Sequence, residues 1–339
     1  MQEEKKLIGY RTYKYKLYQN KKSKQLHEVI NNAAKVYNHL IKLQKKYYNI
    51  YKKSLHKYTV QKHITKLKNI ARKRISYGNN DTKFAILLKL NSTIITNITE
   101  RIERSYKLFF TNIKKKVVCS PPKLQDINRY RSITLKGGIG FKVLSDNIFK
   151  IMKEEYKFFK DRLFTGNIAL VHIKRDLLGE LYVYVVAKEE IMIKQNKSIL
   201  SARITYNLDK FIDVENLNDN SIQTYDISEY IKRAMLRMYE ARRIYEKKQK
   251  NSNNKERALL FYRRSYRKVI RCRNDFYYKL ALELVRKYKT IEVIDNSNLL
   301  KNINDNNKKL YDNGYNNFIS ILIWQGVKYD CIVNTTIVK

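Results

Sequence analysis

The chain has 339 residues, of which 71 are lysine or arginine and 31 are aspartate or glutamate, so its formal net charge is +40. A chain of this length can form roughly two or three domains, each with its own hydrophobic core. Repulsion among so many positive charges is unfavourable unless a polyanion normally binds the protein. The composition therefore favours a surface that binds nucleic acid over a basic surface that is only solvated. The 28 tyrosines interleave with the lysines, and their rings can stack on bases while the cations bind phosphates.

The apolar segments do not predict a membrane span, since even the longest run, Leu181–Ala187, is far shorter than the roughly 20 residues that a bilayer requires. The first residues, MQEEKK, do not resemble a signal peptide, so we expect a cytosolic protein without membrane contact. Cys119, Cys272 and Cys331 are far apart and the histidines form no ligand cluster, so we expect neither disulfides nor a metal site.

The first two thirds of the chain change from helical to strand-like patterns. An alternating strand is predicted over Tyr13–Tyr18, and helical spacing then follows. The predicted helices cover residues 26–41, 60–75 and 82–116, with a turn over 79–81. The predicted strands that follow the Pro121-Pro122 pair cover residues 130–135, 141–144, 169–175 and 181–187, and residues 176–180 form the hairpin turn between the last two.

The last third predicts an α/β domain. Three strands are expected over residues 202–206, 211–214 and 221–225. Ser228 is the predicted N-cap of a first long helix, and a second, basic helix carries the stripe from Leu259 to Arg273. The segment Arg271–Asn302 then reads as an amphipathic helix, a strand over 291–295 and a polar loop, before a helix over 316–326 and a strand over 331–338. This order is typical of an RNase H-like domain, although several other α/β folds share it.

Several motifs in sequence order resemble TnpB, the family of transposon-encoded RNA-guided DNA nucleases. They are YKYKLY at 13–18, KVYNHL at 35–40, RSYKLFF at 104–110, PPKLQDINRYRSIT at 121–134, VHIKRDLLGELYVYVVA at 171–187, the Arg271–Asn302 segment, and NNFISILIWQGVKYD at 316–330. Each motif is weak by itself, but their common order is specific. The resemblance implies an α+β multidomain fold. A helical recognition domain (21–116) is inserted in a β-barrel, wedge or OB-like domain (1–20 and 117–197), and a truncated RuvC-like, RNase H-like α/β domain (198–339) follows.

The sequence departs from this family at the positions that bind the catalytic metals. The family's first aspartate lies six residues before a phenylalanine, which corresponds here to Thr205 before Phe211, and its glutamate corresponds to Ile294. The third active-site segment with its aspartate, and the zinc module, are expected to be absent. Two-metal hydrolysis needs carboxylates that hold magnesium, so we predict a nuclease-dead protein with no catalytic residue and no catalytic cofactor. A replacement site built from Asp209, Asp213, Glu292 and Asp295 is disfavoured, because Asp209 and Asp213 lie beyond the end of the first strand.

The resemblance implies guide RNA and double-stranded target DNA as partners. The candidate nucleic-acid-binding residues are Lys14, Lys16, Arg129, Arg131, Arg263, Arg264, Arg267, Lys268 and Arg271. The candidates for reading a short motif beside the target are Tyr58, Ser92, Thr96, Asn97 and Thr134, each of which could equally be an ordinary surface residue of its element.

The function that these expectations favour is that of the TnpB-like nuclease-dead repressors, or TldR proteins. One copy would bind one guide RNA in the bacterial cytosol or nucleoid, hold a matched DNA target beside its adjacent motif, and repress transcription by blocking RNA polymerase. The alternatives are an RNA-guided nuclease, either an active or decaying TnpB or a compact type V CRISPR effector, and a basic RNA-binding protein that uses no guide.

Overall fold

The computed structural model describes residues 6–78, 84–162, 164–295 and 314–337. The chain divides into two compact units. The N-terminal unit is Gly9–Glu189, and the C-terminal unit is Glu190–Lys339 together with Met1–Ile8. No helix in the described ranges is both long and apolar enough to cross a bilayer.

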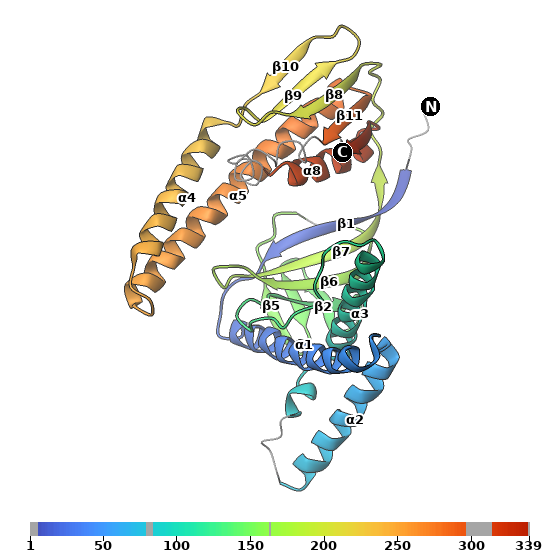
Figure 1. Ribbon diagram of the computed structural model, residues 1–339, viewed down its shortest axis with the longest axis vertical. Helices are drawn as coiled ribbons and strands as arrows, with labels where there is room; N and C mark the ends of the chain where they lie inside the picture. The colour runs from blue at the N-terminus through green and yellow to red at the C-terminus, as the bar shows by residue number, and fades with distance from the viewer. Residues whose placement is uncertain (1–5, 79–83, 163, 296–313, 338–339) are drawn as a thin grey trace. The chain divides into compact units, whose positions relative to one another are not determined.

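The N-terminal unit is built on three long helices, α1 (Ser23–Tyr51), α2 (Lys57–Ser76) and α3 (Ser92–Lys114), with a short 3-10 helix, η1 (Ala85–Leu87), before α3 (Figure 1). Helices α1 and α2 confirm the helical spacing read from the sequence. Helix α3 begins ten residues later than position 82, where the pattern placed its start, because Asn91 caps it and accepts a hydrogen bond from Thr93 N at 2.8 Å. The predicted turn at 79–81 lies outside the described residues.

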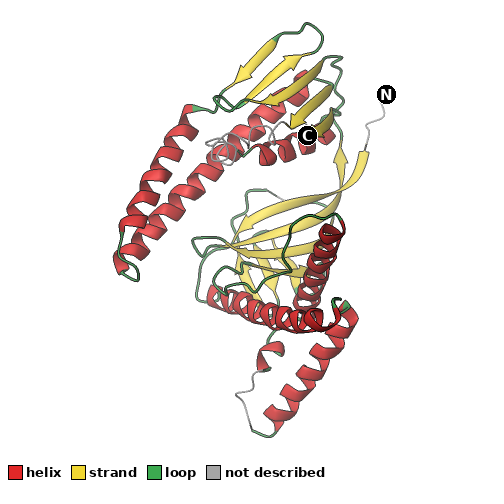
Figure 2. Cartoon of the chain, in the orientation of Figure 1, coloured by secondary structure: helices red, strands yellow, loops and turns green. Residues whose placement is uncertain are grey.

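The N-terminal sheet, whose strands are among those drawn in yellow in Figure 2, has the strand order β1 (Lys6–Lys16), β7 (Leu181–Met192), β6 (Asn167–Arg175) and β2 (Ser132–Lys136). The predicted hairpin turn between β6 and β7 is confirmed, since the Asp176 carboxylate accepts from the backbone N–H groups of Leu178 and Glu180, both at 2.8 Å. A separate meander contains β3 (Phe141–Ser145), β4 (Ile148–Ile151) and β5 (Glu154–Lys157). The sequence analysis missed β4 and β5, which are short, and β5 reads EEYK, a charged string without an apolar alternation.

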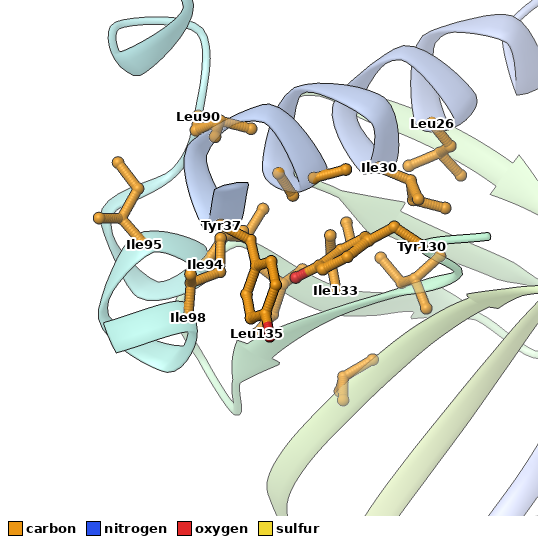
Figure 3. Packing of buried hydrophobic residues seen from close by; sticks show 14 of the residues in the cluster. Leu26, Ile30, Tyr37, Leu90, Ile94, Ile95, Ile98, Tyr130, Ile133 and Leu135 are labelled. Atoms are coloured by element: carbon orange, nitrogen blue, oxygen red, sulfur yellow. The ribbon is translucent and has the colours of Figure 1, made fainter. Parts of the chain in front are cut away.

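The helices and both sheets of the N-terminal unit share one hydrophobic core. Figure 3 shows Leu26 and Ile30 of α1 beside Tyr130 and Ile133, and Ile94 and Ile98 of α3 nearby. The described strands of the N-terminal unit form two open sheets and no closed barrel, although a bridge between Leu17 and Phe158 links strand β1's end to the meander's end. The expected division into a barrel domain and an inserted helical domain stays a prediction.

The C-terminal sheet has the order β10 (Ile222–Tyr225), β9 (Ile212–Asn216), β8 (Ser201–Tyr206), β11 (Thr290–Asp295) and β12 (Ile332–Ile337). Strands β8, β9 and β10 are antiparallel neighbours, whereas β11 is parallel to both β8 and β12. Burial alternates along β8 and β11, so Ile204 and Val293 face the core while Thr205 and Glu292 face away from it. The predicted loop after Asp295 lies outside the described residues.

In the part of the C-terminal unit that the structure describes, the helices are α4 (Glu229–Lys247), α5 (Asn253–Lys287) and α8 (Tyr315–Lys328). Ser228 occupies the N-cap position of α4 as predicted, but its side chain makes no capping hydrogen bond. The basic helix and the amphipathic helix before β11 are one continuous helix, α5, because nothing between Leu259 and Leu284 breaks the helical pattern. Phe211 is fully buried among the rings of Tyr277, Tyr315 and Phe318. The only tryptophan of the sequence, Trp324, lies on α8 with 36% of its surface exposed.

Candidate nucleic-acid interface

Thr205 and Ile294 are direct partners across the parallel strands β8 and β11. Paired residues of neighbouring strands point to the same face of a sheet, so both side chains lie on the face of the C-terminal sheet that points away from its core. The sequence analysis singled out these two positions from separate motifs, and the register brings them together. If both were acidic, as in the resembled family, two carboxylates would lie side by side here.

Arg203 occupies the same face, two residues before Thr205 on β8. Its guanidinium donates to Glu292 Oε2 on β11 at 3.1 Å, and lies 3.3 Å from Glu215 Oε2 on β9. The hydrogen bond to Glu292 and the charges of both glutamates raise the pKa of Arg203. Arg203 therefore forms ion pairs with a glutamate on each neighbouring strand, Glu292 on β11 and Glu215 on β9.

Asp213 pairs with Thr205 from the other side, on β9. The sequence analysis correctly placed it beyond the end of the first strand, but that does not remove it from the site, because β9 runs back beside β8. Its carboxylate accepts from Asn207 Nδ2 at 2.9 Å and from Thr224 Oγ1 at 2.6 Å. Asp209 is exposed in the turn before β9, and Asp295 is the last residue of β11. No group of three or more His, Cys, Asp or Glu side chains with metal-binding geometry occurs in the described ranges.

Helices α4 and α5 pack side by side (Figure 1). Residues of both helices line a groove of about 750 Å³. Of the basic residues predicted on α5, Arg264 and Lys268 line this groove. Arg263 and Arg267 are half-buried and Arg271 is exposed, and none of these three lines it. The groove also contains Arg233 and Arg237 of α4. The sequence analysis missed both, although their spacing of four residues within a predicted helix was the signal that could have found them.

The outer face of the N-terminal sheet carries a second basic and aromatic surface. Lys14 Nζ lies 4.5 Å from the ring centroid of Tyr182, and Lys174 Nζ lies 4.4 Å from that of Tyr184. Lys16 lies on the same strand as Lys14 but forms an ion pair with Glu180 at 2.9 Å. Ammonium groups held over aromatic rings keep their charge, so Lys14 and Lys174 give this face a positive potential.

Thr134 lies in this sheet but is buried, with 7% of its surface exposed. Its Oγ1 lies 2.9 Å from Nδ1 of His172, its partner on β6. Burial lowers the pKa of His172, and the charges of Lys174 and Arg101 lower it further. The structure thus places a buried Thr134 and a half-buried His172 on the same face of the sheet as Lys174 and Tyr184.

The other candidates for reading an adjacent motif lie on the helices. Tyr58 is in the first turn of α2 and is exposed, and Ser92 is exposed at the start of α3, where Thr96 and Asn97 are half-buried. Arg101, one turn after Asn97, donates to the Tyr130 hydroxyl at 3.1 Å. Helix α3 packs against β2, the strand that carries Thr134. Among the candidates on helices, Asn97 thus lies on the helix that packs against the strand of Thr134.

Arg129 and Arg131 flank the buried Tyr130, and of the two Arg129 is exposed and Arg131 half-buried. The segment is held by Arg175, which donates to the backbone carbonyls of Tyr130 at 2.8 Å and Ile127 at 3.2 Å. Burial lowers the pKa of Arg175, and the nearby charge of Arg131 lowers it further. Arg175 is a structural cation that the sequence analysis did not identify.

No protein-family model matches the chain. No curated protein matches it either. Among solved structures, the chain is similar to a Cas12f1–sgRNA–target DNA complex, with a TM-score of 0.48, 12% identity, and coverage of 97% of this chain and 89% of that one. It is also similar to a CRISPR-Cas12f ternary complex (TM-score 0.35, 12% identity, coverage 93% and 72%). A third is Alicyclobacillus acidoterrestris C2c1 with single-guide RNA (TM-score 0.30, 8% identity, coverage 82% and 57%).

Proposed function

We propose that this chain is an RNA-guided DNA-binding protein that does not cleave its target. The observation that carries the proposal is the pairing of Thr205 with Ile294 on adjacent parallel strands. The antiparallel β10-β9-β8 meander joined to parallel β11 and β12 is the strand arrangement of an RNase H-like domain, which supports a RuvC-like origin. In such a domain the paired positions would hold the catalytic metals.

The surroundings of the pair support the absence of cleavage. Magnesium requires oxygen ligands in near-octahedral geometry, and neither a threonine hydroxyl nor an isoleucine supplies a carboxylate. Glu215 and Glu292 share one guanidinium, and Asp213 already accepts hydrogen bonds from neighbouring side chains. A divalent cation at this face would have to displace Arg203 or remain beside its positive charge, which is unfavourable.

The basic surfaces support the binding part of the proposal. Part of the net charge of +40 lies on two surfaces that also carry aromatic rings, the outer face of the N-terminal sheet and the groove between α4 and α5. Phosphate contacts of this kind supply affinity without reading sequence. Sequence choice would then come from a guide RNA, as the resemblance to TnpB implies, and a target in a promoter would make the bound protein a repressor.

Small-RNA sequencing of the purified protein tests the guided part of this proposal. We expect one discrete RNA species with a constant scaffold and a variable guide, and we expect the matching DNA to be protected from nuclease digestion and to stay intact with Mg²⁺. Bulk cellular RNA without a common scaffold would contradict guided binding and favour the generic RNA-binding alternative. Cleavage of the matched DNA with Mg²⁺ would contradict the inactive site, provided that a Thr205→Ala, Ile294→Ala variant lost the cleavage.

A further inference from the structure

The groove between α4 and α5 contains four cationic side chains in two helical pairs. Arg233 and Arg237 are four residues apart on α4, and Arg264 and Lys268 are four residues apart on α5. Residues at this spacing lie on the same side of a helix, so each pair projects from one wall of the groove. No ion pair joins any of these four to another residue in the described part of the chain. Glu240 of α4 also lines the groove, but the four cations outnumber this one carboxylate, so an excess of positive charge faces an anionic ligand.

Two aromatic rings lie among these cations. Tyr230 on α4 has 44% of its surface exposed and Phe261 on α5 has 51%, and both line the groove. A single exposed ring is ordinary, but two exposed rings in one groove form an apolar surface of the kind that marks a binding site. Nucleobases present such a surface, and aromatic side chains interleaved with cations are the arrangement that binds single strands.

We propose that this groove binds single-stranded nucleic acid, with the phosphates on the four cations and bases stacked on Phe261 and Tyr230. The inference deepens the proposed function and rests on it, because guided target opening produces single strands that the protein must hold. A duplex fits the observations less well. Its bases are stacked on one another, so it could use the cations but would leave the rings unpartnered.

Binding of labelled oligothymidylate of about 12 nucleotides to the full-length protein, stripped of bound RNA, tests the inference by fluorescence anisotropy across a salt series. We expect Phe261→Leu, which keeps the apolar volume and removes the ring, to weaken single-strand binding by about 5- to 100-fold and duplex binding much less. The Arg237→Gln, Lys268→Gln variant should reduce the slope of log affinity against log salt by about 1.4, or about 0.7 for each lost phosphate contact.

Arg242→Gln is the matched control, since Arg242 is on α4 but outside the groove and pairs with Glu246 at 2.8 Å. It should leave the single-strand affinity close to that of the wild type, and thermal unfolding should show that all variants are folded. Equal binding of oligothymidylate by the wild type and Phe261→Leu would overturn the inference, as would an equal loss of duplex and single-strand binding in Phe261→Leu.

The inference and the proposed function can fail separately. If Phe261→Leu loses oligothymidylate binding while the wild type co-purifies with bulk RNA, the groove binds single strands and the guided function is wrong. If the wild type protects a guide-matched target and Phe261→Leu binds oligothymidylate normally, the guided function holds and the inference is wrong. If wild-type protein prefers an acidic peptide to oligothymidylate, the groove is a protein-docking surface and the inference is likewise wrong.

Discussion

The two main sheets expose faces that are both polar but handle charge differently. On the C-terminal sheet, Arg203 lies between Glu215 and Glu292, so charges of opposite sign compensate one another within the face. On the N-terminal sheet, Lys16 pairs with Glu180, while Lys14 and Lys174 lie over tyrosine rings, so the lysines outnumber the carboxylate beside them. A polyanion therefore gains more from the second face than from the first. The comparison teaches that the arrangement of charged partners, more than the number of charged residues, separates a face that would attract a polyanion from one that would not.

The largest expected effect is a loss of stability on truncating a core residue of the C-terminal unit, beneath its sheet. Phe211→Ala deletes a fully buried ring that lies 5.2 Å from the Tyr315 ring and 5.5 Å from the Tyr277 ring, and should destabilise the C-terminal unit by about 3–5 kcal/mol. Calorimetry should show one unfolding transition move to lower temperature while that of the N-terminal unit stays. An equal shift of both transitions would mean that the units do not unfold independently.

Removing the two cations of the N-terminal face should weaken DNA binding. A Lys14→Gln, Lys174→Gln variant is expected to bind a duplex about 10- to 100-fold less tightly at moderate salt, with a salt slope smaller by about 1.8. The matched control is Lys153→Gln, Lys157→Gln, which removes the same charge from exposed positions on the β3–β5 meander. If the control lost as much affinity as the test variant, overall charge rather than the cation–aromatic face would govern binding.

The stability of the two units should respond differently to mild acid, because all five histidines lie in the N-terminal unit. Burial lowers the pKa of His27 and His172 below the usual 6.5, and nearby cations lower both further. Above about pH 6.5 both histidines are neutral in the folded and the unfolded chain, so their protonation does not change the free energy of unfolding. As the pH falls below that value the unfolded chain takes up protons that the folded unit resists, so stability is lost until the lowered pKa is passed, by at most about 1.4 kcal/mol per pH unit for each histidine.

Urea unfolding at about pH 7.5 and about pH 5.5 measures this difference. The N-terminal transition should move to lower urea in acid, and the C-terminal transition should move much less over the same interval. His172→Asn should make the N-terminal unit less sensitive to pH. A C-terminal transition that moved equally would show that histidine burial is not the source of the effect.

The smallest effect concerns the metal-binding capacity of the C-terminal face. A Thr205→Asp, Ile294→Glu variant would place two carboxylates on paired strands about 4.8 Å apart, where their repulsion is relieved by a divalent cation. Mg²⁺ should then stabilise the variant by a few tenths to about 1 kcal/mol and leave the wild type unchanged. Stabilisation of the wild type to the same extent, measured by thermal unfolding, would reveal a metal site elsewhere.

Local patterns in the sequence predicted most helices and the longer strands, because periodic burial is a local property. The β6–β7 hairpin, for example, was visible from two apolar runs around the Asp176–Glu180 turn. The late start of α3 and the short strands β4 and β5 were not predicted, since a capping Asn91 competes with apolar spacing and a four-residue strand has too few alternations.

Long-range features of the site could be predicted only in part. Family motifs identified Thr205 and Ile294, but their pairing depends on a strand register between segments 89 residues apart, which no local pattern fixes. The same holds for Arg203, whose partners come from two other strands. The basic residues of α5 were found by composition, whereas the groove appeared only when α4 supplied its second wall.

Trp324 offers an optical consequence of this architecture. It is the only tryptophan of the chain and belongs to the C-terminal unit, whereas the 28 tyrosines are spread over the sequence. Light absorbed by tryptophan but not by tyrosine would therefore report on the C-terminal unit alone. About one third of Trp324 is exposed, and its ring centroid lies 5.8 Å from Lys328 Nζ. The fluorescence emission maximum should therefore shift when α8 separates from the sheet and the indole becomes solvated. The protein thus carries a built-in fluorophore for the unit that holds the Thr205–Ile294 pair.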